Sequence, residues 1–398
     1  MGVKMQNFTI FNPVKVIFGC GTLESCGREA QKLGKKALII TGKNSTKKTG
    51  VLDKVLGILK GNNIEFAVYS NITPNPKTDE VDEAAELGKK ENCDFVIGLG
   101  GGSAMDAAKG AAIVLKSGGN LWDYVAIANK KAKQIEDVAP IMLIPTLAAT
   151  GSEANPAAVF TNRQTQQKTA IYNPLKLYPK ISIVDPELTL TVPKRQTAEG
   201  IIDIMMHVLE EYLTGDEDCE LQDRITEGII LTCMENAAVL MENSQNIKAR
   251  TDISFCATVA LQGLPNAGRA GTWVVHPIEH AITGIYDNIA HGTGIAAVLP
   301  SYLRFLGQRK NAKVKQLAIR IFGADEYADE EELYEVCAKG FEDFIESLGI
   351  PNNLQDAGVE KSDLEKIAKN LFVVSGIPTV IGDKENLMKI LNNAYDKK

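Results

Sequence analysis

The sequence concentrates all four of its histidines in two short segments of its second half. Asp203 and His207 are four residues apart in GIIDIMMHVLEEY, and His276 and His280 are four residues apart in HPIEH, with His291 eleven residues beyond His280. Residues four apart share one face of a helix. Imidazole and carboxylate together suit a divalent metal such as iron or zinc. The spacing therefore predicts that the two segments close around one metal ion, although histidines packed in a core would give the same pattern. HExxH, the metalloprotease signature, is absent.

A glycine-rich segment could bind phosphate. Gly100, Gly101 and Gly102 precede Ser103, between a predicted strand and a predicted helix. Glycines let a phosphate approach the backbone, and a helix N-terminus offers free N–H groups and a partial positive charge. Ser103 and Asp106 have the S-x-x-D spacing of an N-cap followed by a carboxylate at the third helical position. The segment is not GxGxxG, and a tight, well-capped turn is the alternative interpretation.

Two further loops follow predicted strands, where α/β sheets bind their ligands. The first contains Gly42, Asn44 and Ser45 and carries no acidic residue, but three lysines at positions 43, 47 and 48. A neutral, basic loop fits the 2′-phosphate of NADP better than the free ribose of NAD; a solvated lysine loop is the alternative. The second loop, 146–155, is rich in small and hydroxyl residues and contributes Thr146, Leu147 and Thr150 to the predicted lining of the cofactor cleft.

Hydrophobic patterning divides the chain into two predicted domains, 1–190 and 191–398. In the first half, strands are predicted over 36–41, 65–70, 93–100, 140–146 and 181–185, with helices between them over 50–62, 78–91 and from 103 onward. This alternation indicates a mostly parallel sheet covered by helices on both faces. From about residue 194 the pattern is helical, and Pro186 and Pro193 indicate the boundary. We expect the metal of the helical domain to face the glycine-rich segment across an interdomain cleft.

Composition excludes several classes of protein. A chain of 398 residues with 44% hydrophobic and 23% charged residues is typical of a two-domain soluble protein. Its net charge of −7 argues against a general nucleic-acid binder, which would be basic. Seven scattered cysteines without CxxC spacing, and an N-terminus without an apolar signal segment, predict a cytoplasmic protein that neither spans nor binds a membrane.

The chain resembles the iron-containing (group III) alcohol dehydrogenases from end to end. The matching segments, in chain order, are NPVKVIFGCG, TPNPKTDEVDEA, DFVIGLGGGSAMDAAKG, IPTLAATGSEAN, IVDPELTLTVP, GIIDIMMHVLEEY and HPIEHAITGIYDNIAHGTGIAAVLP. IPTLAATGSEAN is most similar to the butanol-dehydrogenase-like branch, which reduces aldehydes. The resemblance implies a Rossmann-like dinucleotide-binding domain joined to an all-α domain, the dehydroquinate synthase-like fold. It also implies a homodimer in which N-terminal strands pair across subunits, and iron as the metal, with zinc also allowed by the ligand types.

The resemblance assigns roles to individual residues. It places the metal ligands at Asp203, His207, His276 and His291, and a histidine beside the nicotinamide that is not a ligand at His280. It places the pyrophosphate cradle at Gly101, Gly102 and Ser103 with Asp106 nearby, other cofactor contacts at Thr146, Thr150 and Lys168, and the adenine-ribose end at Gly42 and Ser45. One departure is an extra residue between His280 and His291, which would rotate His291 by about 100° if it lay inside a helix. We expect a loop to absorb it.

The predicted reaction is reversible hydride transfer between the nicotinamide of NADP(H), in preference to NAD(H), and a small aldehyde or alcohol such as butanal or butanol. The metal would act as a Lewis acid on the carbonyl oxygen, and His280 would relay a proton. A dehydroquinate synthase-like enzyme, whose basic substrate-phosphate cluster is not evident in the sequence, and a glycerol dehydrogenase-like enzyme are the alternatives of the same fold. A non-catalytic, metal-stabilised binding module is a third alternative, and it gives no reason for a nicotinamide cradle.

Overall fold

The computed structural model describes residues 5–128, 130–215 and 218–396. The chain forms two compact units. One comprises Phe11–Val192 with Ser244–Thr258, and the other comprises Met1–Ile10, Pro193–Asn243 and Val259–Lys398. We refer to them as the α/β unit and the helical unit. These units are defined by the packing of the chain. The division into a cofactor-binding domain, 1–190, and a metal-binding domain, 191–398, stays a prediction.

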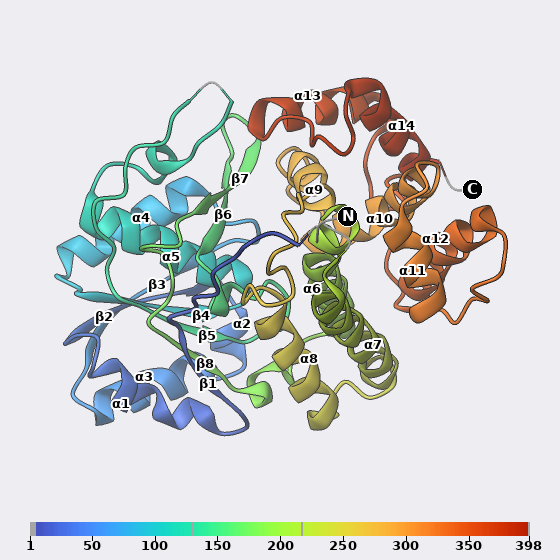
Figure 1. The fold of residues 1–398 in the computed structure, drawn as a ribbon. Helices are drawn as coiled ribbons and strands as arrows, with labels where there is room; N and C mark the ends of the chain where they lie inside the picture. The colour runs from blue at the N-terminus through green and yellow to red at the C-terminus, as the bar shows by residue number, and fades with distance from the viewer. Residues whose placement is uncertain (1–4, 129, 216–217, 397–398) are drawn as a thin grey trace. The chain divides into compact units, whose positions relative to one another are not determined.

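A six-stranded sheet forms the centre of the α/β unit (Figure 1). Its strand order is β1 (Lys15–Phe18), β8 (Ile181–Val184), β5 (Ile141–Pro145), β4 (Phe95–Gly100), β2 (Lys36–Gly42) and β3 (Glu65–Ile72). All pairs in it are parallel, which confirms the prediction from strand–helix alternation. Two antiparallel strands, β6 (Ala157–Asn162) and β7 (Gln167–Tyr172), pair separately.

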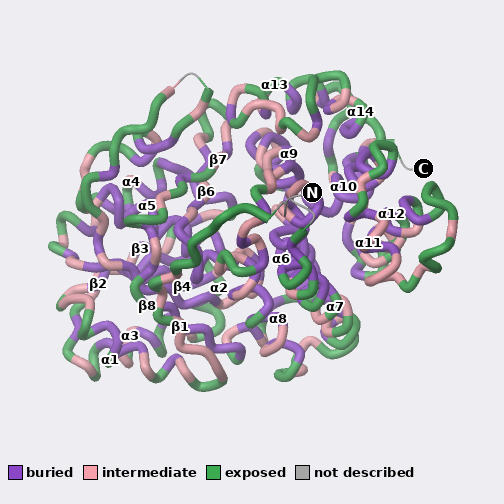
Figure 2. Tube along the Cα trace, viewed as in Figure 1, coloured by how far each residue is buried: buried purple, intermediate pink, exposed green. Residues whose placement is uncertain are grey.

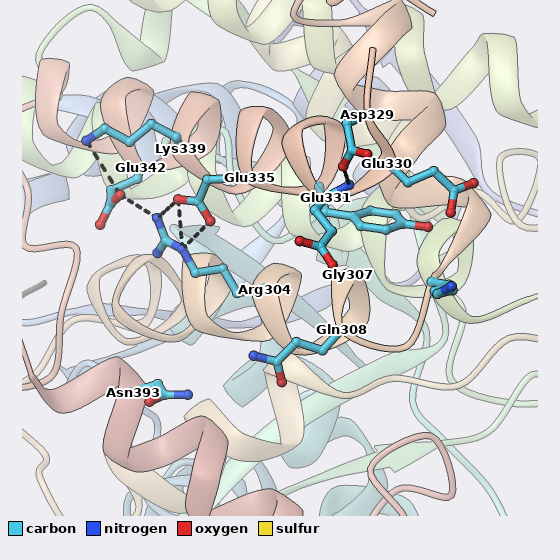
Figure 3. A pocket seen from close by; sticks show the side chains of 12 residues that line it. Arg304, Gly307, Gln308, Asp329, Glu330, Glu331, Glu335, Lys339, Glu342 and Asn393 are labelled. Carbon is cyan, nitrogen blue, oxygen red and sulfur yellow. Dashed lines mark hydrogen bonds and ion pairs between the residues drawn. The ribbon is translucent and has the colours of Figure 1, made fainter. Parts of the chain in front are cut away.

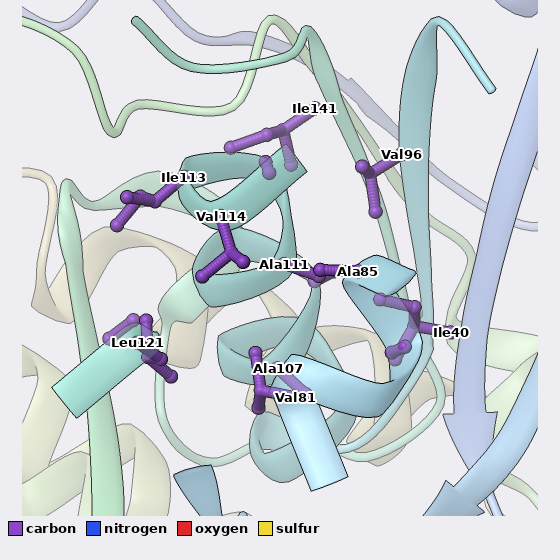
Figure 4. Packing of buried hydrophobic residues seen from close by; sticks show 14 of the residues in the cluster. Ile40, Val81, Ala85, Val96, Ala107, Ala111, Ile113, Val114, Leu121 and Ile141 are labelled. Atoms are coloured by element: carbon purple, nitrogen blue, oxygen red, sulfur yellow. The ribbon is translucent and has the colours of Figure 1, made fainter. Parts of the chain in front are cut away.

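Successive residues of the central strands bury opposite faces of the sheet, as the two-residue period of a strand requires. Leu38, Ile40 and Val96 pack with α4 (Thr78–Lys90) and α5 (Gly102–Ser117). Figure 4 shows Ile40 and Val96 in this cluster. Ile39 and Ile97 pack on the other face with α1 (Cys26–Ala30) and α3 (Val51–Gly61). Both faces are covered, so these strands are apolar throughout rather than alternating.

The helical unit is built around α6 (Lys194–Thr214), which is buried along most of its length (Figure 2). A helix without an exposed face belongs to the interior of a bundle. The other helices are α7 (Glu220–Glu242), α9 (Val275–Thr283), α10 (His291–Gly307), α11 (Ala312–Arg320), α12 (Glu330–Ser347), α13 (Leu364–Val374) and α14 (Lys384–Tyr395). Helix α8 (Ile247–Ala260) begins among the residues assigned to the α/β unit. Within the described residues, every helix is too short or too polar to cross a bilayer.

Candidate metal centre

Helix α6 presents three polar side chains on one face. Asp203, His207 and Glu210 occupy positions i, i+4 and i+7, and all three are buried in a helix that is otherwise largely apolar there. A buried carboxylate or imidazole needs polar partners to offset its lost hydration. These partners come from α9 and from the first residue of α10.

Three imidazoles converge on Asp203. The distances from Asp203 Oδ1 to the Nε2 atoms are 3.5 Å for His207, 3.4 Å for His276 and 3.4 Å for His291. Two ligands of a tetrahedral metal with bonds of about 2.1 Å lie about 3.4 Å apart. The structure therefore brings all three predicted histidine ligands to the Asp203 carboxylate, each at a separation from Asp203 that suits two ligands of one ion. Asp203, His207 and His276 form the candidate metal site itself, with ligand atoms within 4.8 Å of one another.

Residues 284–290 form a loop, so the extra residue before His291 lies outside any helix. Helix α9 ends at Thr283 and α10 begins at His291. The extra residue therefore does not rotate His291 about a helix axis. The first turn of α10 also approaches α6 closely. A Cβ atom on Gly292 would lie 2.2 Å from the backbone oxygen of Glu199, and Thr293 Oγ1 donates to the Glu199 carboxylate at 2.9 Å. Glycine at 292 thus lets His291 reach Asp203.

Two buried glutamates, which the sequence analysis did not single out, contact these imidazoles. Glu210 Oε1 lies 2.9 Å from His276 Nδ1, and Glu279 Oε2 lies 2.5 Å from His291 Nδ1. Glu279, His280 and His291 also form a second group with metal-compatible spacing. However, 2.5 Å is shorter than the separation of about 3 Å between neighbouring ligands of one ion with bonds near 2.1 Å. At this separation Glu279 Oε2 and His291 Nδ1 contact each other directly rather than through an ion.

The charges of the site fit a divalent cation. Asp203, Glu210 and Glu279 place three buried carboxylates around the imidazoles, and buried charges need compensation. Burial lowers the pKa of His207 to about 3, which keeps it neutral, the form that binds metals. Burial also disfavours the charged form of His276, but hydrogen bonds to Asp203 and Glu210 outweigh this and raise its pKa to about 9. Burial opposes the charge of Asp203 too, yet the imidazoles of His207 and His291 hold the pKa of Asp203 well below its usual range.

His280 lies beside this cluster, against Glu279 and His291. Its Nε2 is 3.9 Å from Glu279 Oε2, and its ring centroid is 5.7 Å from that of His291. The side chains of His280 and His291 are 15% and 24% exposed, whereas that of His276 is 3% exposed. The site is therefore accessible on the side of His280 and His291.

The predicted cofactor loops of the α/β unit lie at one edge of its sheet. Because β5, β4 and β2 are adjacent and parallel, the segments that follow them meet at the strands' carboxyl ends. Thr146 N donates to Gly100 O at 2.9 Å. A Cβ on Gly102 would lie 2.4 Å from Thr150 Cγ2, and one on Gly101 would lie 3.5 Å from the Leu147 side chain. These contacts leave no room for larger residues at Gly102.

The predicted capping arrangement of Ser103 and Asp106 is wrong. Helix α5 begins at Gly102 with Gly101 as its N-cap, and no side chain caps it. The carboxylate of Asp106 is buried and accepts from Ser152 Oγ at 2.7 Å and from the backbone of Val159 at 2.9 Å. The Asp106 carboxylate therefore holds the loop that contains Ser152, and strand β6 through Val159, in place. Sequence spacing suggested a local cap because it cannot reveal partners about 50 residues away.

The remaining predicted cofactor residues are divided between the surface and the interior. Gly42 ends β2, and Asn44 and Ser45 are exposed at the start of α2 (Ser45–Lys48). Lys168, on β7, is buried and donates to Asn75 Oδ1 at 2.9 Å. Their contacts with a cofactor stay predictions.

A hollow of about 980 Å³ in the helical unit contains none of these residues (Figure 3). Arg304, Glu335 and Glu342 line it, and both glutamates bind the guanidinium, at 2.7 and 2.9 Å. The lining carries more carboxylates than cations, and it includes none of the predicted metal or cofactor residues.

Comparison with known proteins assigns the chain to a family. Residues 13–186 match the family model described as iron-containing alcohol dehydrogenase, and residues 197–395 match that of the C-terminal part of the Fe-containing alcohol dehydrogenase family. The chain belongs to the iron-containing alcohol dehydrogenases. It is an NAD(P)-dependent oxidoreductase of this family, with the parallel α/β sheet and largely helical second part found in its solved structures.

Three relatives illustrate the likeness. NADH-dependent butanol dehydrogenase A of Clostridium acetobutylicum is 36% identical over 98% of this chain and 100% of the relative. NADPH-dependent aldehyde reductase YqhD of Escherichia coli is 33% identical over 92% of this chain and 93% of the relative. The crystal structure of NADH-dependent butanol dehydrogenase A from Thermotoga maritima, 36% identical, has a TM-score of 0.93 and covers 99% of this chain and 100% of that one.

Proposed function

We propose that the chain is an iron-dependent, NADPH-preferring enzyme that interconverts small aldehydes and primary alcohols, of the butanal and butanol type. The convergence of three imidazole Nε2 atoms on Asp203 Oδ1, within 3.5 Å, carries this proposal. The names of the relatives support the substrate class, because they include butanol dehydrogenases and an aldehyde reductase.

In this proposal Asp203, His207, His276 and His291 hold the metal. A bound ferrous ion would supply Lewis acidity toward the substrate oxygen, and a reduced nicotinamide would supply a hydride. His280, on the accessible side of the site, would hand a proton to the alkoxide during reduction and accept it during oxidation. The apolar surroundings of α6 exclude water from Asp203 and His207, which strengthens their electrostatic contacts.

The loop after β2 supports the preference for NADPH. Asn44, Ser45 and the neighbouring Lys43 and Lys48 are exposed there, and no acidic residue lies between Gly42 and Gly50. A carboxylate at this position would bind the ribose hydroxyl of NAD and repel a 2′-phosphate. The relatives include NADH-dependent and NADPH-dependent enzymes. The proposed preference for NADPH therefore rests on the composition of this loop.

Anaerobic assays of the ferrous-loaded protein with butanal test the proposal. We expect consumption of NADPH with a kcat/KM about tenfold or more above that for NADH, a difference of about 1.4 kcal/mol. His276→Ala should lose the metal, while His280→Ala should keep it and turn over more slowly. Absence of butanal-dependent NADPH oxidation in the metal-replete protein would refute the reaction, and a faster rate with NADH would refute the cofactor preference alone.

We also infer a cytoplasmic homodimer. The resemblance to the family supports the dimer, and the scattered cysteines support a reducing compartment. Sedimentation equilibrium at micromolar concentration tests the dimer, and a monomeric mass would contradict it.

A further inference from the structure

We propose that Glu210 and Glu279 are positioning residues that orient His276 and His291 for metal binding. The proposal rests on the proposed function, because it concerns the same metal. Each glutamate is fully buried, and each places a carboxylate oxygen against the Nδ1 atom of one imidazole, at 2.9 Å and 2.5 Å. A carboxylate only accepts hydrogen bonds, so Nδ1 must donate. In the neutral ring, the form that binds a metal, the lone pair then lies on Nε2, the atom that faces Asp203.

Glu210 also fixes the helix that carries His276. Helix α9 begins at Val275 without a side-chain cap of its own, so the N–H groups of its first turn need other acceptors. Glu210 Oε2 accepts from Val274 N at 2.7 Å and from Val275 N at 3.3 Å, and Oε1 accepts from His276 N at 2.8 Å. A negative charge at a helix N-terminus is favourable. One side chain of α6 thereby sets the position of α9 and the ring orientation of its ligand.

Glu279 fixes His291 from a different direction. It lies on α9, three residues after His276, and reaches the first turn of α10. A Cβ on Gly294 would lie 2.8 Å from Glu279 Cγ, so the glutamate side chain fills the space that the missing side chain leaves. The Glu279 carboxylate therefore has little freedom, and its hydrogen bond holds the imidazole of His291.

His207 provides an internal contrast. Its Nδ1 is buried and has no hydrogen-bond partner among the described residues. His207 lies on the same helix as Asp203, four residues further on, so the helix itself sets its position. The two predicted ligand imidazoles that come from other helices, His276 and His291, are the ones with a carboxylate at Nδ1. This distribution indicates that the glutamates serve to orient ligands that α6 cannot orient directly.

Binding of Co²⁺ to purified full-length protein tests the proposal. Glu210→Gln and Glu279→Gln should each weaken Co²⁺ binding about 10–100-fold in competition with a chelator, the usual effect of losing such a partner. They should also change the visible absorption of bound Co²⁺, which responds to ligand geometry. Glu227→Gln is the matched control: Glu227 is buried in the same unit, but its partners are Tyr212, Gln316 and Arg320. It should lower stability and leave the Co²⁺ affinity and spectrum unchanged.

The outcomes separate this proposal from the proposed function. Absence of Co²⁺ binding to the wild type would refute the metal site and the proposed function with it. Wild-type binding with affinities and spectra unchanged in both glutamine variants would refute the positioning role alone. A change in one variant only would overturn the assignment of the other glutamate. If Glu210→Gln does not fold, as judged by circular dichroism, Glu279→Gln decides the proposal.

Discussion

Replacement of Gly292 by alanine should weaken metal binding although residue 292 binds no metal. The added Cβ would lie 2.2, 2.6 and 2.7 Å from three backbone atoms of Glu199. Ordinary contact begins near 3.4 Å, so the first turn of α10 must withdraw from α6 by about 1 Å. His291 would move with it, and metal sites tolerate ligand shifts of only about 0.2 Å. We expect at least tenfold weaker Co²⁺ binding and a loss of about 1–3 kcal/mol in the free energy of unfolding, from overpacking.

Chelator competition with Co²⁺ and urea unfolding of the metal-free protein measure these two effects. Gly228→Ala is the matched control, because Gly228 is exposed on α7 and its added Cβ would meet nothing within 4 Å. It should raise the free energy of unfolding by up to about 1 kcal/mol, the helix propensity of alanine over glycine, without changing Co²⁺ affinity. Wild-type Co²⁺ affinity in Gly292→Ala would refute the reasoning that α10 sets His291 by close approach to α6.

Three further predictions concern stability. Lys109→Met removes a buried ammonium that donates to three backbone carbonyls within residues 152–157. Urea unfolding should show that the free energy of unfolding falls by more than about 2 kcal/mol. A smaller decrease would contradict this role of Lys109. Burial raises the pKa of Asp82 to about 6, so its contribution to stability is present below the unfolded pKa near 4 and lost as pH rises through 6. Asp82→Asn should therefore raise the melting temperature relative to wild type at pH 7.5 more than at pH 4, and an equal difference at both pH values would count against it. Co²⁺ at one hundred times its dissociation constant should stabilise the wild type by about 2.7 kcal/mol and leave His276→Ala unchanged; an equal gain in the variant would place the metal elsewhere.

Local sequence patterns predicted the elements of this fold well because helices and strands repeat with short periods. Apolar runs gave five of the six strands of the parallel sheet, and helical spacing gave α3 and α4 to within a few residues. The same local reasoning produced the error at Asp106. Its spacing from Ser103 suggested a cap, but burial against Ser152 offered the carboxylate better partners.

The sequence by itself determined which side chains could bind a metal, since Asp203 and His207 share a helix face wherever that helix forms. It also indicated the family and the edge of the sheet where glycines and hydroxyl residues gather. Only the tertiary structure decided that His291 reaches Asp203, because this depends on a loop and on the close approach of Gly292 to α6. It alone paired Glu210 with His276, 66 residues apart. A one-dimensional period fixes what lies on one element, whereas contacts between elements depend on how whole helices pack.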